Sequence, residues 1–192
     1  MGTIITLIIL GLLVALAVYS IILFNGLIRL KHNIDRAWSN IDVLLKQRYD
    51  ELPKLVSVCE GYMKHERAVL ENVTRARSQL DNAGTGKEVM DANNAISQAL
   101  RSLFAVVENY PDLKADRAFR QLQSRVSQLE DQIADRRELY NDSVNLFNIT
   151  IEQFPDVILA GMMNLAPRQL WQIEPEHRQD VNINFQGSFS NG

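Results

Sequence analysis

The chain begins with one long, uninterrupted apolar run. Residues 3–24 carry no charged side chain, and the first charged side chain is that of Arg29. As a helix rising 1.5 Å per residue, this run would be roughly 33 Å long, about the thickness of the hydrocarbon core of a bilayer. The pattern therefore predicts a transmembrane helix.

Two other interpretations of this run fit less well. Ala15-Leu16-Ala17 has the small-x-small form of a signal-peptide cleavage site, but no Lys or Arg precedes the run, and the run continues well past Ala17. A buried core helix would carry polar side chains along one face, and here such side chains are few. We therefore expect the segment to stay attached as an anchor.

Residues 29–81 carry apolar side chains at helical spacing and charged side chains on most of the other face. This pattern is typical of an amphipathic helix. Pro53 interrupts it, and two interpretations stay open: the helix kinks there, or the chain reverses and a new helix starts, capped by Asp50. Because only Asn25 and Gly26 separate the anchor from this pattern, we expect anchor and first bundle helix to form one continuous rod.

Two further helices are predicted after a cluster of helix-breaking residues at 81–86. The first covers about residues 87–108, with Asn93 at one position of its apolar seam. A turn at 109–112 follows, because the residue before a proline avoids helical geometry. The second helix covers about residues 116–152. The whole chain is thus predicted to be all-α.

The seam of the last long helix is irregular. Two four-residue steps meet at Ile133, and such a stutter brings Arg136 and Arg137 to the edge of the seam. Pro155 ends the helix, and residues 157–163 form a short apolar piece that either lies on the membrane or packs on a neighbouring copy. Beside the seam runs a polar stripe of Asn141, Asn145 and Asn148.

Charge and cysteine content limit the possible partners and the topology. Lys and Arg number 20 against 23 Asp and Glu, so the chain lacks the basic surface that nucleic-acid binding requires. The single cysteine, Cys59, cannot form an intramolecular disulfide and lies on an apolar face. Arg29, Lys31 and Arg36 all follow the apolar run, so the positive-inside bias places the N-terminus outside and residues 25–192 in the cytoplasm.

Three long blocks of sequence carry a family resemblance: residues 25–80 (NGLIRLKHNIDRAWSNIDVLLKQRYDELPKLVSVCEGYMKHERAVLENVTRARSQL), 108–123 (ENYPDLKADRAFRQLQ) and 129–155 (LEDQIADRRELYNDSVNLFNITIEQFP). They resemble the LemA family of bacterial membrane proteins. The resemblance implies one N-terminal transmembrane helix in the bacterial inner membrane, with the N-terminus outside, followed by an up-and-down helical bundle of four-helix type. It implies no catalytic mechanism.

The expected organisation is a membrane anchor at residues 1–26, a LemA-like helical bundle at 27–165 and an irregular C-terminal tail at 166–192. The tail departs from the family pattern after Ala166. It is polar, and we expect an irregular or extended segment with three isolated aromatic residues, Trp171, Phe185 and Phe189.

Sequence motifs for catalysis or for a cofactor are incomplete. His65-Glu66 begins like a helical zinc-protease motif, but Val69 occupies the position that needs a second His. Residues 84–87 (GTGK) resemble the end of a phosphate-binding loop, but Glu88 replaces the Ser or Thr that would hold magnesium. We therefore predict no enzymatic activity, no catalytic residue, no cofactor, no metal site and no small-molecule substrate.

Polar and aromatic side chains enter the seams of the first and last helices. Apolar seams that admit arginine or asparagine usually do so for register or partner specificity, at some cost in stability. We predict a polar layer, inside the bundle or at a subunit contact, formed by Trp38, Asp42, Arg136, Arg137, Tyr140 and Asn141. Gly11 and Ala15 give the anchor a small-xxx-small face suited to contact between transmembrane helices.

Two function classes fit these features. The preferred one is a membrane-anchored structural or interaction protein that self-assembles at the inner membrane and has no catalytic activity of its own. The alternative is an accessory or regulatory subunit of another membrane system, such as a quality-control protease or an envelope stress pathway. The expected partners are the lipid bilayer, further copies of the chain and, in the alternative, another membrane protein.

Overall fold

The computed structural model describes residues 1–172 of the chain. Within them the protein is all-α, as predicted. The described helices are α1 (Gly2–Glu60), α2 (Arg67–Asp81), α3 (Gly86–Val107), α4 (Pro111–Ala115), α5 (Arg117–Glu152) and α6 (Asp156–Met162).

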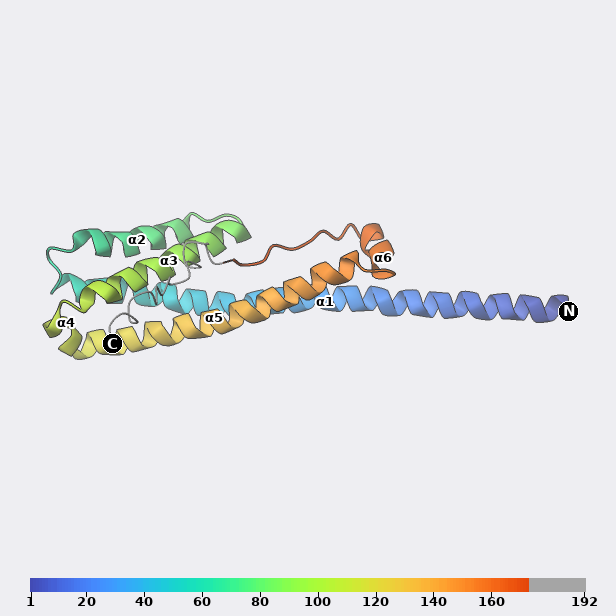
Figure 1. Cartoon of the computed structure of the whole chain (residues 1–192), viewed down its shortest axis with the longest axis horizontal. Helices are drawn as coiled ribbons and strands as arrows, with labels where there is room; N and C mark the ends of the chain where they lie inside the picture. Colours follow the sequence, from blue (N-terminus) through green and yellow to red (C-terminus); the bar gives the residue numbers. More distant parts are fainter. Residues whose placement is uncertain (173–192) are drawn as a thin grey trace, which may run out of the picture.

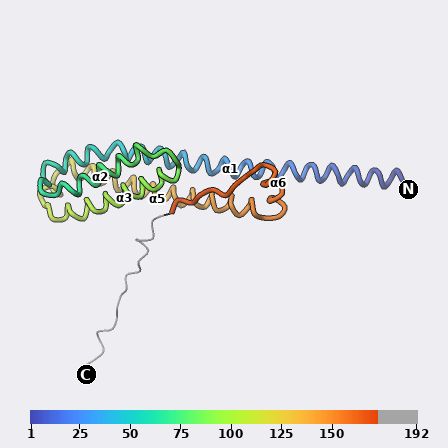
Figure 2. Tube along the Cα trace, turned by 90° about the horizontal axis from the view of Figure 1, so that it is seen from above, coloured from blue at the N-terminus to red at the C-terminus, as the bar shows by residue number. Residues whose placement is uncertain are grey.

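The long helices run up and down along a common axis (Figure 1). α1 leads from the N-terminus into the bundle, α2 turns back, α3 returns, and α5 runs back towards the place where α1 leaves the bundle. Four helices surround the core at the end far from the N-terminus. At the near end, α1 and α5 are accompanied only by α6 and the extended segment 165–172 (Figure 2).

α1 joins the apolar run and the bundle in one helix, as the sequence predicts. By length and composition its first part is apolar enough to cross a membrane. Leu27 is the first buried residue of α1, and nearly all side chains before it are exposed in the isolated chain. This exposure is expected of a segment whose side chains face lipid.

The first reversal of the chain lies after residue 60 and not at Pro53. α1 passes through Pro53, so the interpretation in which Asp50 caps a new helix is wrong. Leu52 and Leu55 on either side are fully buried, so packing holds the helix in place despite the hydrogen bond that proline removes. The break falls instead at residues 61–66, and the single helix expected over 29–81 is two helices.

The predicted break before α3 is confirmed, whereas the turn predicted at 109–112 ends at Tyr110, because the short helix α4 starts at Pro111. At the start of α3, Thr85 Oγ1 accepts a hydrogen bond from Glu88 N (3.3 Å), and Glu88 Oε2 accepts from Thr85 N (3.0 Å). This reciprocal capping box satisfies backbone donors that a helix start would otherwise leave unpaired. After the short helix α4, Asp116 caps α5 by accepting a hydrogen bond from Phe119 N (2.9 Å).

Residues 166–172 are extended, as expected, but Trp171 is not an isolated aromatic. Its side chain is only 2% exposed and belongs to the apolar cluster formed by the near halves of α1 and α5. Because only two long helices build this half, a large indole is needed to cover their seam. Phe185 and Phe189 lie outside the described residues.

Candidate functional site

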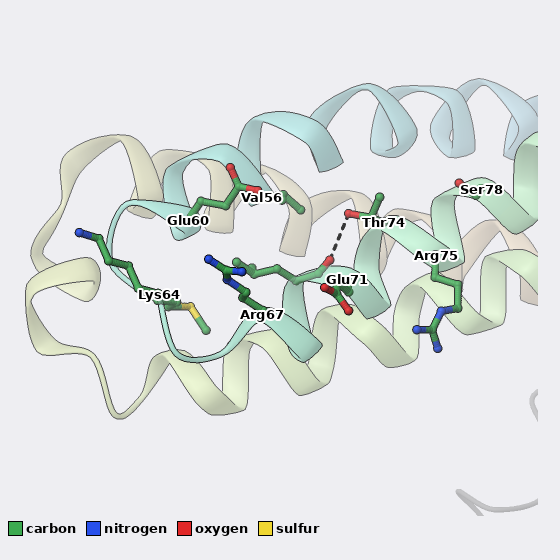
Figure 3. A pocket seen from close by; sticks show the side chains of 10 residues that line it. Val56, Glu60, Lys64, Arg67, Glu71, Thr74, Arg75 and Ser78 are labelled. Carbon is green, nitrogen blue, oxygen red and sulfur yellow. Dashed lines mark hydrogen bonds between the residues drawn. The ribbon is translucent and has the colours of Figure 1, made fainter.

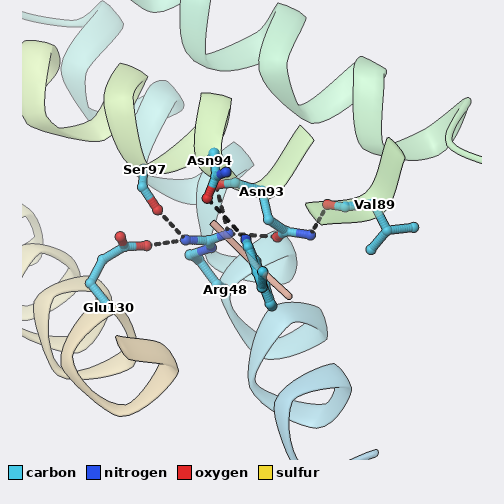
Figure 4. Close-up of polar contacts among 7 residues, drawn as sticks. Arg48, Val89, Asn93, Asn94, Ser97 and Glu130 are labelled. Carbon is cyan, nitrogen blue, oxygen red and sulfur yellow. Dashed lines mark hydrogen bonds and ion pairs between the residues drawn. The ribbon is translucent and has the colours of Figure 1, made fainter. Parts of the chain in front are cut away.

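A buried arginine divides the core in two. Arg48 is 1% exposed and comes from α1, whose other buried seam residues at seven-residue spacing are apolar. Its Nη1 donates to Ser97 Oγ (2.8 Å) and to Glu130 Oε1, and its Nη2 donates to Asn93 Oδ1 (2.6 Å) (Figure 4). Asn93 in turn donates to the carbonyl of Val89 (2.7 Å). We call Arg48, Asn93, Ser97 and Glu130 the arginine layer.

The arginine layer lies between two apolar clusters. Leu45 belongs to the cluster on the membrane side, whereas Leu52, one heptad further, belongs to the far one. A buried guanidinium is costly unless it is paired, and its partners come from α3 and α5. A shift of either helix by one turn would leave the charge unpaired. We infer that the layer fixes the register of α1, α3 and α5.

A second cluster holds the extended segment against the bundle. Trp171 Nε1 donates to Asn94 Oδ1 (3.0 Å), and the ring of Trp38 lies 5.9 Å from that of Trp171 and 5.6 Å from that of Tyr140. Asn141 forms two hydrogen bonds with the backbone of Trp171 (2.8 and 3.0 Å). We call these five residues the tryptophan cluster.

Two asparagines on α5, two helical turns apart, bind the backbone of the extended segment. Asn141 pairs with the backbone of Trp171, and Asn148 pairs in the same two-bond manner with the backbone of Arg168 (2.7 and 2.9 Å). Seven helical residues rise about 10.5 Å, nearly the length of three extended residues. The spacing of Asn141 and Asn148 therefore matches the extended segment that they bind, whereas Asn145, between them, is exposed.

The six residues of the predicted polar layer lie in different surroundings. Trp38, Tyr140 and Asn141 are members of the tryptophan cluster, and the Arg137 guanidinium lies 5.9 Å from the ring of Trp171. Burial lowers the pKa of Arg137, and the nearby Glu130 carboxylate opposes that shift. Two of the six, Asp42 and Arg136, are exposed. Their role at a subunit contact stays a prediction.

The arginine layer was not predicted, although its signal was present in the sequence. Arg48 stands seven residues after Ile41 and seven before Leu55, both of which are buried seam residues. Asn93, noted as a polar seam position, is 1% exposed and binds Arg48. Only the heptad register of α1, carried through Pro53, would have placed Arg48 in the core.

A groove of about 720 Å³ lies between the end of α1 and α2 (Figure 3). Apolar side chains and both signs of charge line it, including Val56, Met63, Leu70, Glu60, Glu71, Lys64, Arg67 and Arg75. The Thr74 hydroxyl there donates to the carbonyl of Leu70 (3.1 Å). The groove thus combines apolar and charged side chains, a lining that could contact both the apolar and the charged side chains of another polypeptide.

Among the described residues, the cysteine and histidine side chains considered in the sequence analysis form no arrangement typical of catalysis. Burial raises the pKa of the Cys59 thiol to about 12, which leaves it a poor nucleophile. His65 lies in the turn at 61–66 and not on a helix. Among residues 1–172, His, Cys, Asp and Glu side chains form no group of three that would hold a metal ion.

An apolar stripe runs along the outer face of α5. Leu139, Leu146 and Ile149 are 50%, 54% and 44% exposed. At 100° per residue Ile149 lies opposite the buried positions Tyr140 and Phe147, and Leu139 and Leu146 lie on the flank between, about 80–120° from them. We call these three residues the outer stripe.

Comparisons with known proteins agree with one another. The sequence model of the LemA family matches residues 37–185. Protein LemA of Metamycoplasma hominis is 31% identical over 162 residues, which cover 82% of this chain and 73% of that protein. Magnetosome protein MamQ 2 of Paramagnetospirillum magneticum is 22% identical over 178 residues, covering 79% of this chain and 65% of that protein. The similarity thus extends over just under two thirds of that magnetosome protein.

Proposed function

The chain belongs to the LemA family, and we propose that it is a membrane-anchored structural protein that self-assembles at the bacterial inner membrane. It acts by presenting its helical rod to further copies of itself and has no catalytic activity of its own. Two features support this proposal: the continuous helix α1 and the uneven construction of the bundle.

The uneven bundle carries the proposal. The half near the membrane has two long helices, the short helix α6 and one extended segment, where the far half has four helices. In that thin half, α5 exposes the outer stripe to solvent. Exposed apolar side chains that recur on one side of a helix are a usual site of helix–helix contact, although here Asp142 and Ser143 lie between Leu139 and Leu146. A second copy of the chain, packed against this row, would complete the near half.

The transmembrane segment supplies a second contact between copies. Gly11 and Ala15 share one face of α1, and a side chain added at Gly11 would meet no other atom within 4 Å in the isolated chain. A neighbouring transmembrane helix could approach closely there. In the proposed assembly, copies would meet inside the bilayer at Gly11 and Ala15 and just outside it at the outer stripe.

The proposed topology has the N-terminus outside and the bundle in the cytoplasm. Arg29, Lys31 and Arg36 on the bundle side of the span support it through the positive-inside bias. Because Cys59 is the only cysteine, an Asp42→Cys chain lacking it (Cys59→Ala) carries one accessible thiol. A membrane-impermeant maleimide should label this thiol only after cells are permeabilised. Labelling in intact cells would contradict this topology and would place the bundle outside the cytoplasm.

Light scattering of the detergent-solubilised full chain tests self-assembly. We expect a protein mass at least twice 21.9 kDa, and a mass close to that value for Leu139→Glu/Leu146→Glu, because charge would replace the outer stripe. Glu71→Gln, exposed on α2, is the matched control and should leave the mass unchanged. A single-chain mass for the unaltered protein at all concentrations would contradict self-assembly.

A second candidate function rests on the groove between α1 and α2. Its apolar floor and mixed charge would suit a segment of another protein, as expected of an accessory subunit of a membrane protease or stress pathway. Recovery of one stoichiometric partner, lost in Arg67→Glu/Arg75→Glu, which changes exposed groove residues, but kept in Leu139→Glu/Leu146→Glu, would favour this candidate. Recovery of the chain alone would favour self-assembly.

A further inference from the structure

The short helix α6 presents an apolar face that the rest of the described chain leaves uncovered. Ile158 and Met162 lie on one side of α6 and are 57% and 75% exposed, and Phe154, just before the helix, is 82% exposed. Ala160, on the other side of α6, is 3% exposed and belongs to the same apolar cluster as Leu27 of α1. One side of this segment is therefore fixed to the bundle, and the other is free.

This free face lies where α1 leaves the bundle. α6 packs against α1, and both views place it at the end of the bundle from which the apolar segment emerges (Figures 1 and 2). Leu27 begins the buried part of α1, whereas residues 3–24 match the hydrocarbon core in length. A bilayer that holds residues 3–24 thus has its surface close to α6.

The free face also continues the lipid-facing surface of the span. Ile21, Ile22 and Phe24 at the end of the span are 59%, 61% and 44% exposed. An apolar surface that begins on α1 and resumes on α6 at the same level is best covered by one occupant. Lipid already covers the first part, which favours lipid over a protein partner for the second.

Charged side chains of both signs lie near this face, as expected of residues in the headgroup layer, but their attraction to lipid is not the main source of affinity. Arg29 and Lys31 follow the span on α1, while Glu152 and Asp156 lie where α5 leads into α6. Because the two signs nearly balance, attraction to anionic lipid is weak. Insertion of the three apolar side chains supplies the affinity, as in helices that lie in the membrane interface.

We propose that residues 154–162 form a second membrane contact, in which Phe154, Ile158 and Met162 insert at the boundary between headgroups and acyl chains. With a single transmembrane helix, the rod formed by anchor and bundle could still tilt and rotate as one body relative to the membrane. A second contact beside it fixes the angle of the α1–α5 rod to the membrane. This inference rests on the proposed spanning of the bilayer by α1.

Fluorescence of the full chain in vesicles tests this contact. With Cys59→Ala as background, single cysteines at positions 158, 12 and 71 carry the polarity-sensitive dye NBD in vesicles of phosphatidylcholine and phosphatidylglycerol. Position 12 reports the span, and position 71, on α2, is the exposed control. We expect blue-shifted emission at 158, quenched more strongly by a lipid spin-labelled near its headgroup than by one labelled deep in its chain. The dye at 71 should emit as in water.

The possible failures are distinguishable. Water-like emission at 158 with a quenched dye at 12 would overturn the second contact and leave the span intact. Blue-shifted emission at 158 that no lipid spin label quenches, and that fades as protein is diluted in lipid, would assign the face to a second copy and also overturn it. An unquenched dye at 12 would overturn the span and, with it, the inference.

Discussion

At the scale of single residues, the arginine layer is the least expected feature. Arg48 occupies a heptad position between Ile41 and Leu55, where an apolar side chain would give more stability. Its guanidinium binds Asn93 of α3 and Glu130 of α5 at one height. We therefore expect the layer to lower the stability of the core in return for a defined helix register.

A double-mutant cycle on Arg48 and Glu130 tests this view. Glu130→Gln removes the carboxylate from a buried guanidinium, and because Glu130 is 26% exposed we expect a loss of about 1–3 kcal/mol of unfolding free energy. Arg48→Met together with Glu130→Gln should cost less than the sum of the single changes. Denaturant unfolding of the solubilised full chain, followed by circular dichroism, measures these values.

The control for this cycle is the pair Asp42 and Arg137. Asp42 is exposed, so Asp42→Asn and Arg137→Met should add with a coupling energy of about zero. Strict additivity for Arg48 and Glu130 as well would mean that the layer does not couple the helices.

At the scale of elements, helix boundaries follow local chemistry closely. The breaker cluster before α3 and the start of α5 near Asp116 depend on the residues at these boundaries, so the sequence predicted both, although it predicted a turn where Pro111 starts the short helix α4. Pro53 is a local signal of the same kind, yet buried contacts of Leu52 and Leu55 override it. Boundaries decided by packing are therefore the ones that a single sequence leaves open.

The extended segment shows the same limit. The polar stripe containing Asn141 and Asn148 was visible in the sequence. The backbone groups that these asparagines bind, however, belong to a segment twenty to thirty residues further along the chain. Nothing in the local sequence around Trp171 marks it as buried. Long-range pairing of this kind, and the arginine layer with it, required the arrangement of helices in space.

The capping box of α3 gives a prediction in acid. Hydrogen bonds from the backbone of Gly84 and Thr85 lower the pKa of Glu88 below its ordinary 4.5, so the unfolded chain binds this proton more readily. The stabilisation from Glu88 is present above about pH 4.5 and is lost as pH falls through its folded pKa. Glu88→Gln should therefore show a smaller drop in melting temperature between neutral and acid pH than the unaltered protein.

Thr85→Ala is the matched control for this effect. It removes the uncharged half of the capping box, so it should cost about 1 kcal/mol at every pH and keep the acid-dependent drop. If Glu88→Gln and the unaltered protein lost stability in parallel on acidification, Glu88 would not be the group responsible.

At the scale of the whole molecule, the protein is a rod built on one helix. α1 runs without a break from the apolar run to the far end of the bundle, so the bundle cannot rotate independently of the anchor. Its thin half lies near the membrane, where α5 exposes the outer stripe. A continuous rod with an uncovered side next to the bilayer is suited to align copies of itself at the membrane surface.

Cysteine cross-linking in isolated membranes tests this account most directly. In a chain carrying Cys59→Ala, a single cysteine replaces either Leu146 on the outer stripe or Glu71 on α2, and mild oxidation follows. The account predicts a disulfide-linked dimer of the full chain from Leu146→Cys and only monomer from Glu71→Cys. Equal dimer from both, or none from Leu146→Cys and from a second stripe variant, Leu139→Cys, would contradict assembly through this face.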